Sequence, residues 1–147
     1  MKYELFLYKT TAFSNDAICI DIVNRAISKN STVDWEGNYA DKTMISFDAE
    51  QVKNKMLDLL TVDGNCLCKI EVRHSPQNHI EYIRILTSYE KAKKVLNVAN
   101  SIAVEYELLL YDTEMDRSFY YGDLYCKKYV TMRLRAQSIN NLFVQTQ

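Results

Sequence analysis

One continuous stretch, residues 87–112, places the strongest limit on how this chain can fold. Its first part carries apolar residues at helical spacing, namely Ala92, Val95, Leu96, Ala99, Ile102, Ala103 and Tyr106. Thr87 and Glu90 have the spacing of a capping box, which predicts that the helix begins directly after Thr87. The apolar run LLLY at 108–111 is too short for a helix and indicates a strand covered on both faces. We therefore expect the other elements to pack around that strand.

The remaining patterns predict an alternation of strands and helices. The alternating residues 2–9 predict a strand with Tyr3, Leu5 and Leu7 on one face. Further strands are expected at 43–47, 66–73, 80–86 and 117–121, and the second and third of these could pair as a hairpin. Helical stripes are expected over about 16–29 and after Asp48, the second with Val52, Met56, Leu59 and Leu60 inward. The tail is ambiguous: 129–135 alternates as a strand does, while 136–143 fits a short helix.

This order of elements predicts the fold class. Hairpins mixed with crossovers favour an α+β fold, a mixed or antiparallel sheet of about five to seven strands with three main helices packed on it. At 147 residues the chain is expected to form a single domain over 1–147. The Asp63-Gly64-Asn65 sequence predicts a turn between the second helix and the strand at 66–73.

Charge and composition exclude several classes of function. The chain has 18 basic and 19 acidic side chains, so it offers no net field to attract nucleic acid. With 3 glycines it cannot build a glycine-rich phosphate loop. No apolar run approaches the roughly 20 residues that span a bilayer, and no apolar leader follows Met1. We expect a cytoplasmic protein with reduced cysteines, without membrane or direct nucleic-acid partners.

The residues able to do chemistry lack the spacing that chemistry requires. His74 and His79 flank a loop near Glu81, but zinc needs three or four convergent ligands, and Cys66 and Cys68 join them only if the sheet brings the loop back. Cys68 or Cys126 beside His74 would make a nucleophile pair, yet no local motif supports one. We therefore expect no metal, no cofactor and no catalytic residues. Basic residues from Arg117 to Arg135 interleave with tyrosines, which fits single-stranded nucleic acid or, more simply, long side chains lying over a sheet.

An acidic stretch follows the central helix. From Glu105 to Asp116 there are five acids and no base. We expect this segment to bind a basic partner, with neighbouring tyrosines as anchors, and predict the partner-binding residues to be Glu105, Glu107, Tyr111, Asp112, Glu114, Asp116 and Tyr120. The alternative is a solvated face and turn, in which Asp112, Glu114 and Asp116 are equally exposed.

The junction EYELLLYD at residues 105–112 resembles a pattern in small bacterial immunity proteins, which protect cells against toxins of contact-dependent inhibition and polymorphic toxin systems. Members of that class often continue with Pro-Gln, where this chain has Thr113-Glu114. The resemblance implies a small cytosolic α/β protein that neutralises a cognate toxin, such as a nuclease, by binding it. It assigns no binding residues. The alternatives are an enzyme with an unrecognised active site and a regulatory or structural interaction module.

Overall fold

The computed structural model describes residues 2–10, 44–75, 79–114 and 117–119. The helix expected over 16–29 and the elements expected in 129–143 lie outside these ranges. Asp116, Tyr120 and Cys126 lie outside them as well. No helix within the described ranges is both long and apolar enough to cross a membrane.

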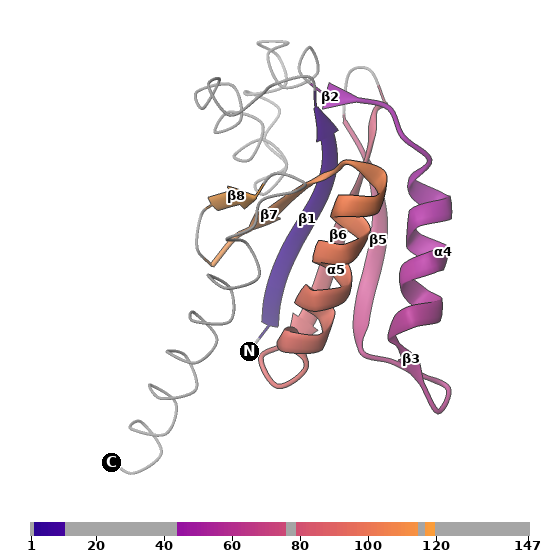
Figure 1. Ribbon diagram of the computed structural model, residues 1–147, viewed down its shortest axis with the longest axis vertical. Helices are drawn as coiled ribbons and strands as arrows, with labels where there is room; N and C mark the ends of the chain where they lie inside the picture. Colours follow the sequence, from indigo (N-terminus) through magenta and orange to yellow (C-terminus); the bar gives the residue numbers. More distant parts are fainter. Residues whose placement is uncertain (1, 11–43, 76–78, 115–116, 120–147) are drawn as a thin grey trace.

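The described residues form an α+β fold built on an antiparallel sheet (Figure 1). The strand order is β5 (Cys68–His74), β6 (Glu81–Ser88), β1 (Lys2–Thr10), β7 (Leu109–Asp112) and β8 (Arg117–Phe119), with β2 (Met44–Ile45) paired to the end of β1. A separate hairpin joins β3 (Thr61–Val62) to β4 (Asn65–Cys66). The helices of the described part are α4 (Ala49–Leu60) and α5 (Ala92–Tyr106), so the three expected helices are not matched there.

The middle strand among the described residues is β1, while β7, which holds most of the 108–111 run, lies inside the sheet between β1 and β8. β1 pairs with β6 on one side and β7 on the other, with Leu5 opposite Ile85 and Asp112. Leu108 to Tyr111 are nevertheless all buried, as the unbroken apolar run predicts. β1 suits the middle because both of its faces are apolar: Leu5 and Leu7 face one way and Phe6 and Tyr8 the other, all fully buried.

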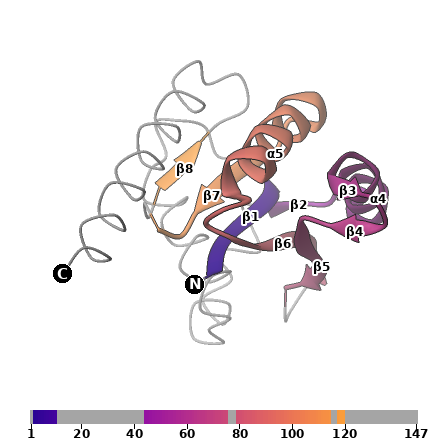
Figure 2. The ribbon, with the colours of Figure 1, turned by 90° about the horizontal axis from the view of Figure 1, so that it is seen from below.

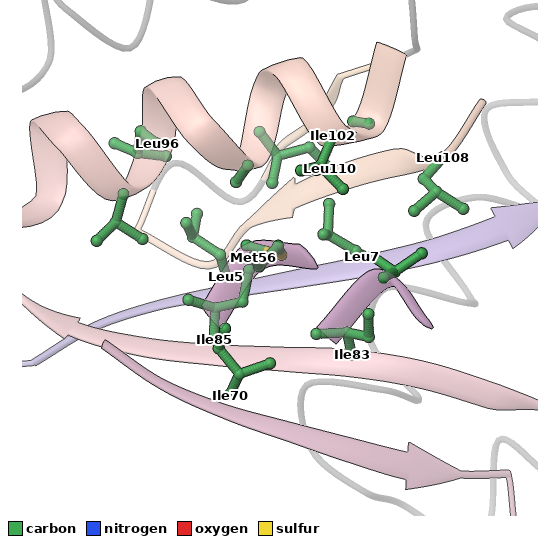
Figure 3. Packing of buried hydrophobic residues seen from close by; sticks show 14 of the residues in the cluster. Leu5, Leu7, Met56, Ile70, Ile83, Ile85, Leu96, Ile102, Leu108 and Leu110 are labelled. Atoms are coloured by element: carbon green, nitrogen blue, oxygen red, sulfur yellow. The ribbon is translucent and has the colours of Figure 1, made fainter. Parts of the chain in front are cut away.

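Both helices cover the same face of the sheet (Figure 2). The stripe of α5 packs with Leu5, Leu7 and Ile85 in one core, and Figure 3 shows Leu96 and Ile102 directed towards these strands. Met56 and Leu60 of α4 are fully buried in the same core, whereas Leu59 is exposed. The stripe predicted for α5 is therefore confirmed, and that of α4 is confirmed except at Leu59.

The start of α5 differs from the prediction. Thr87 is the next-to-last residue of β6, where it faces Tyr3 and Cys68, and its hydroxyl donates a 2.9 Å hydrogen bond to the carbonyl of Leu67. The helix begins at Ala92, and Lys91 caps it without a side-chain hydrogen bond. Strand pairing on both sides therefore takes priority over the local capping box, because Thr87 gains two cross-strand neighbours. The cap predicted for α4 is present: Asp48 accepts a 3.1 Å hydrogen bond from the Gln51 amide.

Candidate partner-binding surface

The predicted partner residue Asp112 is fully buried at the end of β7. Its carboxylate accepts a short hydrogen bond from the hydroxyl of Tyr3, which is also fully buried. Its other oxygen accepts a 3.0 Å bond from the Glu114 amide. The expectation that the turn exposes Asp112, Glu114 and Asp116 equally is therefore wrong for Asp112. Its carboxylate joins β1 to β7 and orders the turn that follows.

Tyr3 is held in its neutral form. Burial raises its pKa above the ordinary value, and the hydrogen bond to Asp112 and the carboxylates of Asp112 and Glu114 raise it further. Tyr89 packs edge-on against Tyr3, with ring centroids 5.5 Å apart, and its hydroxyl donates a 2.5 Å bond to exposed Glu114. These contacts join the residue that follows β6 to the turn after β7.

Glu105 and Glu107 lie at the other end of α5. Glu105 is exposed and pairs with Lys55 of α4, whose ammonium also lies 5.5 Å from the centre of the Tyr106 ring. The pKa of Lys55 lies above its ordinary value, chiefly because Glu105 accepts its hydrogen bond. Glu107 is exposed and ends the helix with left-handed backbone at φ 57° and ψ 52°. Glu107 therefore has a backbone role as well as a charge.

The predicted residues do not form one acidic patch. Tyr89 precedes α5 and holds Glu114 near the start of the helix, whereas Glu105 and Glu107 lie at its end. A helix of 15 residues is about 22 Å long, so the two groups of acids are far apart. Tyr111 is buried on the opposite face of the sheet from the helices, stacked on Phe6. The premise of a single cluster is wrong, while partner binding by exposed Glu105, Glu107 and Glu114 stays a prediction.

A charge network crosses three strands on the face of the sheet away from the helices. Arg84 of β6 donates a 2.5 Å bond to Glu4 of β1 and a 3.2 Å bond to Glu71 of β5. Glu71 also pairs with Lys69 at 3.0 Å and Arg73 at 3.3 Å. Lys69 first, together with Arg84 and Arg73, lowers the pKa of Glu71 to about 2. The five charges satisfy one another, so this network serves to join the strands.

The residues considered for metal or nucleophile chemistry remain separate. His74 faces Glu81 across the β5–β6 hairpin, with 3.3 Å between Nε2 and Oε1. His79 is exposed. Cys66 and Cys68 are free, half-buried thiols against the helix-covered core, and burial raises the pKa of Cys68 to about 12. Within the described ranges no group of three or more His, Cys, Asp or Glu side chains is placed to hold a metal ion.

Sequence reasoning missed an exposed surface at the end of α4. Residues 58–65, hereafter the 58–65 surface, are all exposed except Leu60, whose side chain is in the core. They end α4 and continue into the β3–β4 hairpin, which projects beyond the helix (Figure 1). Leu59 is 50% exposed and Val62 is 43% exposed, beside Asp58 and Asp63. The helical spacing assigned Leu59 to the buried stripe, so its exposure was not foreseen.

The third large hydrophobic residue exposed in the described part of the chain is Val104, next to Glu105. Each of the three exposed hydrophobics thus has an acidic neighbour in the sequence. Such an arrangement can bind a partner that offers apolar contact within a basic surface.

No family model, no curated protein and no solved structure matches the chain.

Proposed function

We propose that this chain is a small binding protein that neutralises a cognate bacterial toxin, that is, an immunity protein. The observation that carries the proposal is the pairing of exposed apolar and acidic residues: Asp58 with Leu59, Val62 with Asp63, and Val104 with Glu105. The resemblance of residues 105–112 to immunity proteins gives the specific form of the proposal. The chain would act in the cytoplasm of the cell it protects.

The chemistry of these surface residues suits a basic toxin domain. A toxin that cleaves nucleic acid needs a cleft lined with lysine and arginine to hold phosphate. An acidic surface is attracted to such a cleft, and this attraction raises the association rate at low salt. Exposed apolar side chains then supply contact area that charge alone does not. Binding of this kind blocks the toxin by occupying its active site or the path of its substrate.

A growth assay tests the proposal. A candidate toxin domain is sought among the genes beside that of this chain and is induced in a host cell with and without the chain; the absence of any such domain counts against the proposal. We expect growth arrest by the toxin alone, full growth when both proteins are produced, and recovery of the two proteins as a one-to-one complex. A catalytically inactivated toxin serves as the control for expression burden. Continued growth arrest, with the chain produced in soluble form and absent from the toxin fraction, would contradict the proposal.

A further inference from the structure

We infer that the 58–65 surface is where a basic protein partner docks, with Leu59 and Val62 entering an apolar site rimmed by lysine or arginine. This inference rests on the proposed function and deepens it, because it names the surface and the chemistry of the partner. It also relocates the contact from the predicted acidic stretch at 105–116 to the end of α4 and the β3–β4 hairpin.

The apolar content of this surface is concentrated. Leu59 and Val62 are separated by three positions, while Val104 is the third exposed large hydrophobic in the ranges the structure describes. Single exposed hydrophobics are common on protein surfaces, whereas Leu59 and Val62 belong to one projecting segment and give it two exposed apolar side chains. Leu60 between them is fully buried and fastens this segment to the core, so the exposed pair is presented on a fixed base.

Asp58 and Asp63 supply the charge of this surface. Residues 56–68 contain Asp58 and Asp63 and no lysine, arginine or histidine. Neither aspartate takes part in a salt bridge within the described part of the chain. By contrast, Glu105 beside Val104 is paired with Lys55, so its charge is already partly neutralised. The free negative charge therefore accompanies the larger apolar contact, which selects a basic partner.

The segment is also held in a fixed shape. The hydroxyl of Thr61 donates a 2.6 Å bond to the carbonyl of Leu57, and the Leu67 amide donates a 2.9 Å bond to the carbonyl of Leu60. Asp63 and Gly64 form a tight turn with φ values of 52° and 80°, for which Asp-Gly is a favoured sequence. A segment ordered before binding loses less conformational entropy on association, which favours its use as a contact.

Two pairs of substitutions separate this surface from the rest of the molecule. Leu59→Gln with Val62→Thr removes the apolar contact, and Asp58→Asn with Asp63→Asn removes the charge at nearly constant shape. Asn tolerates the left-handed backbone at position 63, so folding should be retained. The matched control is Glu50→Gln with Glu90→Gln, which removes two exposed acids outside the 58–65 surface and outside the pairs on which the proposed function rests. Circular dichroism and the melting temperature of each variant verify the fold.

Binding kinetics are measured by surface plasmon resonance on the full chain, with the candidate toxin domain of the growth assay as the probe, at two salt concentrations. We expect the apolar variant to lose about tenfold or more in affinity, the size of a contact worth over 1 kcal/mol. The asparagine variant should associate on the order of tenfold more slowly at low salt, with little change at high salt. The control variant should bind as the parent does.

The outcomes distinguish the two proposals. Parent-like binding by both 58–65 variants would overturn the docking surface while leaving the proposed function in place. If the parent does not bind the toxin domain, the proposed function is overturned. The docking surface is then overturned as well, with one exception. It stands if a basic protein recovered from the host at equal stoichiometry loses its binding to the Leu59→Gln with Val62→Thr variant. Sedimentation of the parent as a dimer that Leu59→Gln with Val62→Thr dissociates would assign this surface to a second copy and overturn the basic partner.

Discussion

At the scale of single residues, the Tyr3–Asp112 pair shows why a charged side chain cannot be assigned to the surface from sequence alone. Asp112 ends an apolar strand and precedes an acidic turn, yet it is fully buried and accepts a hydrogen bond from the Tyr3 hydroxyl. A buried carboxylate requires hydrogen-bond donors because its desolvation is costly. Its partner comes from β1, 109 positions away, and no local pattern reveals such a partner.

Replacing Tyr3 by Phe tests the pair. We expect a loss of about 1–3 kcal/mol of unfolding free energy at neutral pH, since the buried carboxylate loses a donor. The raised pKa of Tyr3 also makes the unfolding free energy depend on pH. Above about pH 10 a tyrosine ionises in the unfolded chain, whereas Tyr3 stays neutral in the folded chain, so stability falls as pH rises. Urea unfolding from pH 7 to 11 should show a shallower alkaline decline for Tyr3→Phe. Tyr106→Phe is the control, and an unchanged alkaline slope in Tyr3→Phe would contradict the assignment.

Glu107 offers a second test at this scale. Its left-handed backbone is unfavourable for a residue with a side chain and natural for glycine at the end of a helix. Glu107→Gly should therefore raise the unfolding free energy by about 0.5–1 kcal/mol, after the greater freedom of glycine in the unfolded chain is included. Glu107→Ala removes the same charge without relieving the backbone. Equal melting temperatures for the two variants would show that the backbone at this position is not strained.

At the scale of elements, α5 packs its apolar stripe against the sheet in the described core. Leu96→Ala should lower the unfolding free energy by about 2–5 kcal/mol, because Leu96 is buried between α5 and the sheet. Val104→Ala on the exposed side of the same helix should change it by less than about 0.5 kcal/mol. Chemical denaturation of both variants measures the contrast. Similar midpoints for both would mean that the helix face is assigned wrongly.

The charge network on the other face joins β5, β6 and β1 in a pH-dependent way. The pKa of Glu71 is lowered to about 2, so its stabilising effect is present above the ordinary glutamate pKa of about 4.3 and is lost as pH falls towards 2. Glu71→Gln should reduce the dependence of stability on pH between 5 and 2. Glu90→Gln, an exposed position before α5, is the control. An acid unfolding profile of Glu71→Gln that coincides with the parent would exclude this role.

At the scale of the whole molecule, periodicity predicted most of the described fold. The alternation in 2–9 matches β1, the 66–73 and 80–86 segments pair as β5 and β6, and the apolar stripe of α5 lies in the core. These predictions succeed because burial on one face imposes a regular spacing on the sequence. The start of α5 was predicted wrongly because Thr87 has cross-strand neighbours that a local motif does not include.

The candidate site was predicted less well than the fold. Grouping Glu105, Asp112 and Glu114 by sequence ignored that α5 and β7 run in opposite directions, which places the groups at different ends of the helix. The 58–65 surface was missed because Leu59 fits the helical stripe by spacing alone. Exposure depends on where the layer of helices ends over the sheet, and this is a property of the tertiary arrangement. A candidate binding surface is therefore identified from exposed apolar and charged side chains that lie in the same part of the folded chain.

The most direct test of the proposed toxin binding is a calorimetric titration of the full chain with the candidate toxin domain of the growth assay. We expect a one-to-one complex with a negative heat-capacity change, because apolar surface is buried, and an affinity that weakens as salt increases. The Leu59→Gln with Val62→Thr variant should show a smaller heat-capacity change than the parent. No heat of binding at micromolar concentrations, from a chain that is folded and a toxin that is active, would contradict the assignment of this protein as an inhibitor of that toxin.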